Sequence, residues 1–124
     1  MKNLPTRIER RRTKHFKLPP NTVCITRGTA FGNPIKVGEW WVMHVDGLGK
    51  LRFRHSQNEF TGATYIEDNQ MAVEWYRQWI EHHPLDYDQR KRLETADHLA
   101  CFCKPVEPCH GDVLLDILRK QTEF

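Results

Sequence analysis

The sequence predicts an α/β protein, with a small sheet of two central parallel strands, flanking helices and an inserted β-hairpin. Two short apolar runs, at 23–26 and 98–103, are typical of buried strands. Stretches with helical periodicity lie between and after these runs. A pair of strand-like runs flanks an Asp-Gly turn, which indicates a hairpin. Strands interleaved with helices favour a parallel sheet covered by helices.

The strands follow from local pattern. The first is the β-branched run Val23 to Thr26, which Gly28 ends. The hairpin pairs residues 39–45 with residues 51–56 around Asp46-Gly47. The last strand is the apolar run from 98 to 103, and a proline-bounded loop follows it.

Three helices are expected. The clearest runs from Asn69 to His82, and Pro84 ends it. Its apolar side chains recur at i, i+3, i+4, i+7 and i+8, namely Ala72, Trp75, Tyr76, Trp79 and Ile80. This aromatic stripe is interpreted as core packing. A more polar helix is expected from Asp86 to Ala96 and a last one from Asp112 to Lys120.

Length and composition describe an ordinary soluble protein. The chain has 124 residues, of which 39% are hydrophobic and 28% charged. No apolar run approaches the ~20 residues that span a bilayer, and no signal core follows the N-terminus, so a cytoplasmic location without membrane partners is expected. Four cysteines in such a chain point to thiols or metal ligands rather than disulfides.

The charge is asymmetric, which defines the expected domains. Residues 1–17 hold seven Lys/Arg against one acid, whereas the remainder is net acidic by three charges. We therefore expect a basic arm at 1–20, broken off by Pro19-Pro20, and a single α/β domain at 21–124. A basic arm suits a nucleic-acid backbone or an acidic protein partner; a solvated tail is the alternative. The candidate nucleic-acid contacts are Arg10, Arg11, Arg12, Lys14 and Lys17 in the arm, and Arg52 and Arg54 on one face of the hairpin.

Two loops supply the candidate pocket. In parallel sheets, ligands bind beyond the carboxyl ends of the strands, so the loops after the first and last strands should meet. The first loop offers Arg27 as a bidentate cation, Gly28 and Gly32 as turn residues, and Asn33 as an amide for a sugar or base edge.

The second loop offers catalytic candidates. Cys109 lies before a helix, where the dipole lowers a thiol pKa, and Gly111 permits close approach to the backbone. His110 and Asp112 form a candidate pair for proton transfer.

Three interpretations of this cysteine-rich segment compete. The first is a pocket for a nucleotide- or phosphate-type ligand. The second is ordinary packing of small residues between strand and helix, with His110 as a cap. The third is zinc bound by Cys101, Cys103 and Cys109, with His110 or Cys24 as fourth ligand. The spacing C-x-C-x5-C-H differs from that of a standard zinc knuckle. We therefore expect no cofactor and rank zinc last of the three interpretations.

Two motifs carry a resemblance to a known family. They are "RGTAFGNP" from Arg27 to Pro34 and "LACFCKPVEPCHGDVLLDIL" from Leu99 to Leu118. Over about residues 22–120 the chain resembles the uncharacterised bacterial and phage proteins numbered 4326 in the domain-of-unknown-function series. The resemblance implies a bacterial or phage origin, and a host-cytoplasmic location if phage-encoded. It implies no activity.

The function expected from these observations is a pocket for a nucleotide- or nucleic-acid-type phosphate ligand. Whether the pocket is catalytic stays open. The alternative is a non-enzymatic interaction module that binds nucleic acid or an acidic host protein through the basic arm.

Overall fold

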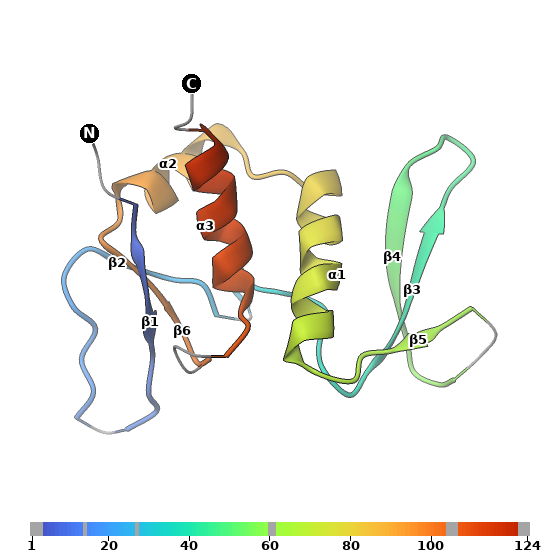
Figure 1. Cartoon of the computed structure of the whole chain (residues 1–124), viewed down its shortest axis with the longest axis horizontal. Helices are drawn as coiled ribbons and strands as arrows, with labels where there is room; N and C mark the ends of the chain where they lie inside the picture. The colour runs from blue at the N-terminus through green and yellow to red at the C-terminus, as the bar shows by residue number, and fades with distance from the viewer. Residues whose placement is uncertain (1–3, 14, 27, 60–61, 104–106, 122–124) are drawn as a thin grey trace. The chain divides into compact units, whose positions relative to one another are not determined.

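The computed structural model describes residues 4–13, 15–26, 28–59, 62–103 and 107–121, and the chain divides into two units. Unit 1 comprises Met1–Gly32 and Leu85–Phe124, and unit 2 comprises Asn33–Pro84. Unit 1 carries a parallel sheet and unit 2 an antiparallel one, so the mixed α/β class is confirmed (Figure 1).

Sheet A of unit 1 has the order β1-β6-β2. Its strands are β1 (Thr6–Glu9), β2 (Thr22–Cys24) and β6 (His98–Cys101). Both outer strands pair with β6 in parallel, and both begin opposite His98. The expected adjacency and parallel direction of the two apolar strands are therefore confirmed. All three strands end at the same edge of the sheet, which we call the carboxyl edge.

Two helices complete unit 1. Helix α2 (Tyr87–Thr95) begins at a capping box in which Asp86 and Gln89 bond each other's backbone N–H groups. Helix α3 (His110–Gln121) lies along the strands in Figure 1. The core of this unit is apolar and almost fully buried; its main members are Ile25, Phe31, Leu93, Leu99, Ala100, Val113, Leu114 and Leu118.

Unit 2 contains the hairpin and the first helix. Sheet B has the order β4-β3-β5, with β3 (Trp40–Val45), β4 (Leu51–Ser56) and β5 (Thr64–Tyr65) all antiparallel. Helix α1 (Asn69–His82) has the expected bounds, and Asp68 caps it. Trp75 and Trp79 pack against a core of Ile35, Ile66 and Ala72, which confirms that the aromatic stripe serves packing.

The structure differs from expectation in two places. Residues 6–9 of the expected arm form β1, because β6 offers them a parallel hydrogen-bonding edge. Helix α3 begins at His110, two residues earlier than expected, because Asp112 accepts a hydrogen bond from the Cys109 N–H.

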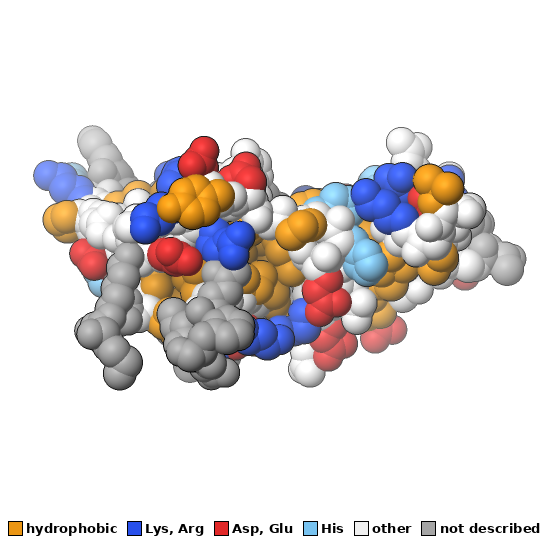
Figure 2. Space-filling view, turned by 90° about the horizontal axis from the view of Figure 1, so that it is seen from above, with side chains coloured by type: hydrophobic (Ala, Val, Ile, Leu, Met, Phe, Trp, Pro, Cys, Tyr) orange, Lys and Arg blue, Asp and Glu red, His pale blue; other side chains and the backbone are white. Residues whose placement is uncertain are grey.

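The surface mixes charges of both signs. On the face drawn in Figure 2, basic and acidic side chains lie beside one another. Among the described residues, no helix is both long enough and apolar enough to cross a bilayer.

Candidate metal centre

Three thiols gather where β6 ends and α3 begins. The Sγ atoms of Cys101, Cys103 and Cys109 all lie within 4.8 Å of one another, and those of Cys101 and Cys109 are 3.2 Å apart. Cys101 and Cys109 are buried, whereas Cys103 is half-buried. The cluster therefore sits at the carboxyl edge of sheet A, with access to solvent on the side of Cys103.

Cys24 lies elsewhere. It pairs in register with Ala100, so its side chain shares the face of Ala100 and points away from that of Cys101. Its Sγ accepts a hydrogen bond from Arg10 at 3.5 Å. All four cysteines are free thiols.

The three clustered thiols do not titrate alike. The pKa of Cys101 is lowered to about 2, because hydrogen bonds from Cys103 and Cys109, and one from Arg7, favour its thiolate. The pKa of Cys109 is raised, because its thiol bonds Cys101 and Cys103 and is buried. The pKa of Cys103 is also raised, chiefly by its hydrogen bond with Cys101. The three sulfur atoms thus share hydrogen bonds with one another, and the Cys101 Sγ also donates to the Ile8 carbonyl.

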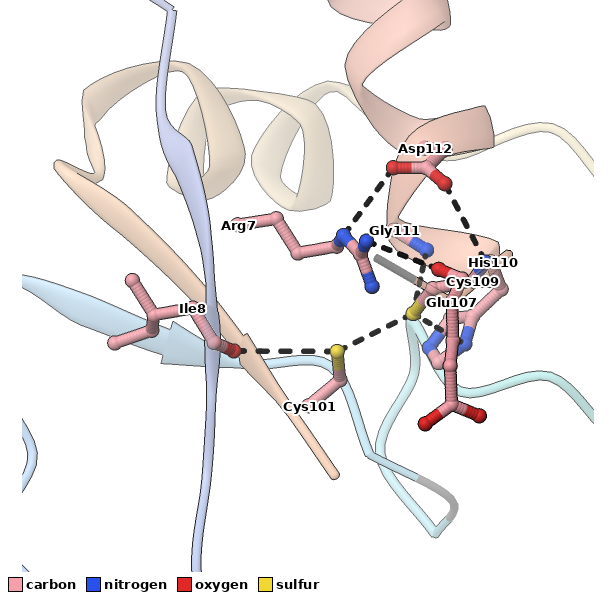
Figure 3. A network of polar contacts seen from close by, with 8 residues as sticks. All are labelled: Arg7, Ile8, Cys101, Glu107, Cys109, His110, Gly111 and Asp112. Atoms are coloured by element: carbon pink, nitrogen blue, oxygen red, sulfur yellow. Dashed lines mark hydrogen bonds and ion pairs between the residues drawn. The ribbon is translucent and has the colours of Figure 1, made fainter. Parts of the chain in front are cut away.

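A buried cation from β1 borders the thiols (Figure 3). The Arg7 Nε lies 3.2 Å from Asp112 Oδ1, and its Nη2 donates to the Glu107 carbonyl at 3.0 Å. Only 10% of the Arg7 side chain is exposed. Arg7 therefore ties β1 to α3 and places a positive charge beside the sulfur atoms.

His110 is oriented by the loop after β2. Its Nε2 contacts the Ile25 carbonyl oxygen, which can only accept, so Nε2 carries the proton. Its Nδ1 lies 3.7 Å from the Cys109 Sγ. The segment directly after β2 thus meets the start of α3 at the carboxyl edge, where the Ile25 carbonyl contacts the His110 ring.

Asp112 and Gly111 take roles other than those expected. The Asp112 carboxylate contacts Arg7 and the Cys109 N–H rather than orienting the imidazole. At Gly111, an added Cβ would lie 2.8 Å from the Ile25 Cδ1 and 3.1 Å from the Arg7 Cδ. Protein side chains therefore fill the space in front of Gly111.

The residues expected to line the pocket from the first loop give no evidence for a ligand. Arg27 lies outside the described residues. Gly28 has a φ of +89°, which favours glycine there whatever the function. The N–H of Gly32 donates to Thr29 in a turn. Asn33 is 5% exposed; its amide donates to the Ala72 carbonyl and accepts from the Ile35 N–H, so it braces unit 2. The nucleotide pocket stays a prediction.

The residues expected to contact nucleic acid differ in their surroundings: some form ion pairs, some lie over an aromatic ring and others are simply exposed. Arg11 pairs with Glu9 at 3.6 Å, and Arg52 pairs with Asp46 at 2.8 Å. Arg10 and Arg12 instead lie over the Phe102 ring, 5.4 Å and 4.3 Å from its centroid. Lys17 and Arg54 are exposed, and Lys14 lies outside the described residues.

Sequence reasoning missed two residues of this region. Arg7 was counted as an arm cation, and Phe102 as part of a strand. The alternation of Arg7 and Glu9 with Ile8 is a strand signal, but four residues are too short a run to separate it from a charged tail.

The thiol cluster has the dimensions of a zinc site. A tetrahedral Zn²⁺ with Zn–S bonds of 2.3 Å holds its sulfur ligands about 3.8 Å apart. The Cys101–Cys109 separation of 3.2 Å and the limit of 4.8 Å for all three pairs bracket that value. The cluster could therefore hold a metal ion such as zinc.

The comparisons with known proteins identify a family and no activity. No curated protein and no solved structure matches the chain. The family model described as "Domain of unknown function (DUF4326)" matches residues 8–120, which include β6, the thiol cluster and the start of α3. The chain belongs to this family.

Proposed function

We propose that Cys101, Cys103 and Cys109 bind one zinc ion as three thiolates and leave its fourth position open to water or a ligand atom. The convergence of three thiols within 4.8 Å at the carboxyl edge carries this proposal. A disulfide needs two cysteines, whereas three in one cluster match the ligand set of a soft-metal site.

The charges around the cluster suit a zinc–thiolate complex with a net negative charge. A Zn²⁺ ion with three thiolates has a formal charge of about −1. The Arg7 guanidinium, which is nearly buried beside the cluster, offsets that charge. Hydrogen bonds within the cluster lower the pKa of Cys101, which eases the loss of its proton to a metal ion.

The fourth position is the functional part of the proposal. Among the described residues, the cluster contains no fourth Cys, His, Asp or Glu. Cys24 lies on the other face of sheet A, and His110 is not among the residues whose ligand atoms all lie within 4.8 Å of one another. Three protein ligands plus water is the arrangement of catalytic rather than structural zinc sites. Such an ion polarises phosphoryl or carbonyl oxygens, which agrees with the phosphate-type ligand expected from the sequence.

The test compares two cysteine variants. We expect one zinc per chain in the parent and in Cys24→Ser, and a large loss in Cys103→Ser, measured by elemental analysis after purification under reducing conditions. Cys103 is half-buried, so its replacement should leave the fold intact, which circular dichroism can check. A parent that binds no zinc even on reconstitution would refute the proposal, as would equal zinc in both variants.

The open position has its own test. Cobalt replacing zinc should show thiolate charge-transfer bands and tetrahedral ligand-field bands. Added cyanide should shift the ligand-field bands if the fourth position is open. Bands that ignore cyanide would indicate a closed, structural site.

A further inference from the structure

The carboxyl edge of sheet A carries a second feature, which is independent of the metal. Strand β1 ends at Glu9 and β6 at Cys101, opposite each other in register. The residues that follow, Arg10 to Arg12 on one side and Phe102 on the other, therefore emerge together. The Arg10 N–H donates to the Cys101 carbonyl, which continues the pairing beyond the strands.

The side chains of this region form a cationic–aromatic surface, which we define as Arg10, Arg12 and Phe102. The Arg12 guanidinium carbon lies 4.3 Å from the Phe102 ring centroid and that of Arg10 lies 5.4 Å away. Phe102 is 38% exposed, although a phenyl ring normally avoids water. Stacking on the ring leaves the N–H edges of a guanidinium available to an anion.

These two arginines differ from the other cations of the region. Arg7 and Arg11 have carboxylate partners, Asp112 and Glu9. For Arg10 and Arg12, no carboxylate of the described residues lies within ion-pair distance. No carboxylate therefore neutralises their charge within the described residues, although one guanidinium nitrogen of Arg10 donates to the Cys24 Sγ.

We propose that the surface formed by Arg10, Arg12 and Phe102 binds single-stranded nucleic acid. Phosphate oxygens match the guanidinium N–H groups of Arg10 and Arg12, and an unpaired base can stack on the exposed part of the phenyl ring or on a guanidinium plane. A duplex offers the phosphates but keeps its bases inside, so the aromatic member favours a single strand. An acidic protein would meet the charge but would leave the exposed ring unused.

The experiment measures binding of a fluorescein-labelled oligodeoxythymidylate of about 12 nucleotides, within the site size of one small domain. Fluorescence anisotropy across a salt series gives the affinity and the salt slope. Each phosphate neutralised on a single strand contributes about −0.7 to the slope of log K against log salt. Arg10→Ala/Arg12→Ala should therefore make the slope shallower by about 1.4.

The matched control is Arg119→Ala/Lys120→Ala. It removes the same charge, but from the last turn of helix α3. This control should keep the parent's slope. Phe102→Leu should keep the slope and weaken binding roughly fivefold or more, as expected for the loss of one stacked base. A duplex of the same length should bind more weakly than the single strand.

Several results would overturn the proposal. One is a parent that does not bind the oligonucleotide. Another is an equal change of slope in the two double variants, which would reflect net charge alone. Unchanged affinity in Phe102→Leu, or equal affinity for the duplex, would remove the single-strand assignment. Because Cys103→Ser leaves this surface intact, its binding should equal that of the parent, so a failed zinc site and a failed nucleic-acid surface can be told apart.

Discussion

Replacing Gly111 with alanine tests how closely β1, the loop after β2 and α3 approach one another. The new Cβ would lie 2.8 Å from the Ile25 Cδ1 and 3.1 Å from the Arg7 Cδ, whereas ordinary contacts span 3.4–4 Å. Ile25 is fully buried, so its side chain cannot swing into solvent. Overpacking of this kind costs about 1–3 kcal/mol, and alanine returns up to about 1 kcal/mol of helix propensity. We expect a net loss of about 1–2 kcal/mol in the free energy of unfolding.

A second substitution isolates the contact. Ile25→Val removes the Cδ1 atom and alone should cost about 0.5–1.5 kcal/mol. In the double variant the added Cβ meets no Cδ1, so the two losses should sum to less than their separate values, with a coupling of about 1 kcal/mol. Strict additivity would refute the packing argument, as would a Gly111→Ala protein as stable as the parent.

The assay must report on unit 1. All four tryptophans lie in unit 2, so their fluorescence follows the other unit. Urea unfolding followed by far-ultraviolet circular dichroism, with hydrogen exchange of the β6 and α3 amides, is the better measurement. Gly47→Ala is the control, since its Cβ would meet nothing within 4 Å, and it should change stability by less than about 0.5 kcal/mol.

Two further predictions concern unit 2. The pKa of Asp46 is lowered to about 2 by hydrogen bonds from Arg52 and from the N–H groups of Lys50 and Leu48. The stabilisation of the hairpin by the Asp46 carboxylate is therefore complete above its usual pKa near 3.8 and is lost as the pH falls through about 2. The amide chemical shifts of the turn should follow this titration. An Asp46→Asn hairpin whose amide shifts change with pH in the same way would contradict the prediction. Asn33→Ala should lower the free energy of unfolding by about 2–4 kcal/mol, since it leaves a buried N–H and a buried carbonyl without this partner. Urea unfolding followed by tryptophan fluorescence measures that loss, and an unaffected midpoint would show that the amide does not brace the unit.

Much of the fold followed from local sequence. Helix α1 was predicted with its bounds, because a 3.6-residue apolar period and Pro84 mark both its face and its end. The hairpin was predicted because the Asp46 turn separates two runs of alternating residues. Strand β1 was not predicted, because it pairs with β6 across about ninety residues of sequence and its own four residues carry little local pattern.

The site was predicted only in part. The meeting of the segment after β2 with the start of α3 followed from the rule for parallel strands, and the Ile25 carbonyl does contact His110. The thiol cluster was ranked last, because the spacing of the cysteines differs from that of familiar zinc motifs. Spacing alone could not show that the chain returns after β6 and brings the Cys109 sulfur to 3.2 Å from that of Cys101. Asn33 shows the opposite problem, since an amide suited to a ligand is used by the backbone of its own unit.

The placement of β1 changes how the basic segment can be tested. Deleting residues 1–17 would remove cations, but it would also remove an outer strand of sheet A and the Arg7 side chain that borders the thiols. A truncated protein that lost nucleic-acid binding or zinc could have lost either through damage to the sheet. Substitutions at Arg10 and Arg12 avoid this ambiguity, because both residues follow β1 and their side chains lie over an exposed ring rather than in the core. The same strand thus supports the metal centre through Arg7 and leads into the nucleic-acid surface through the residues after Glu9, so only point variants can assign a loss of binding to one or the other.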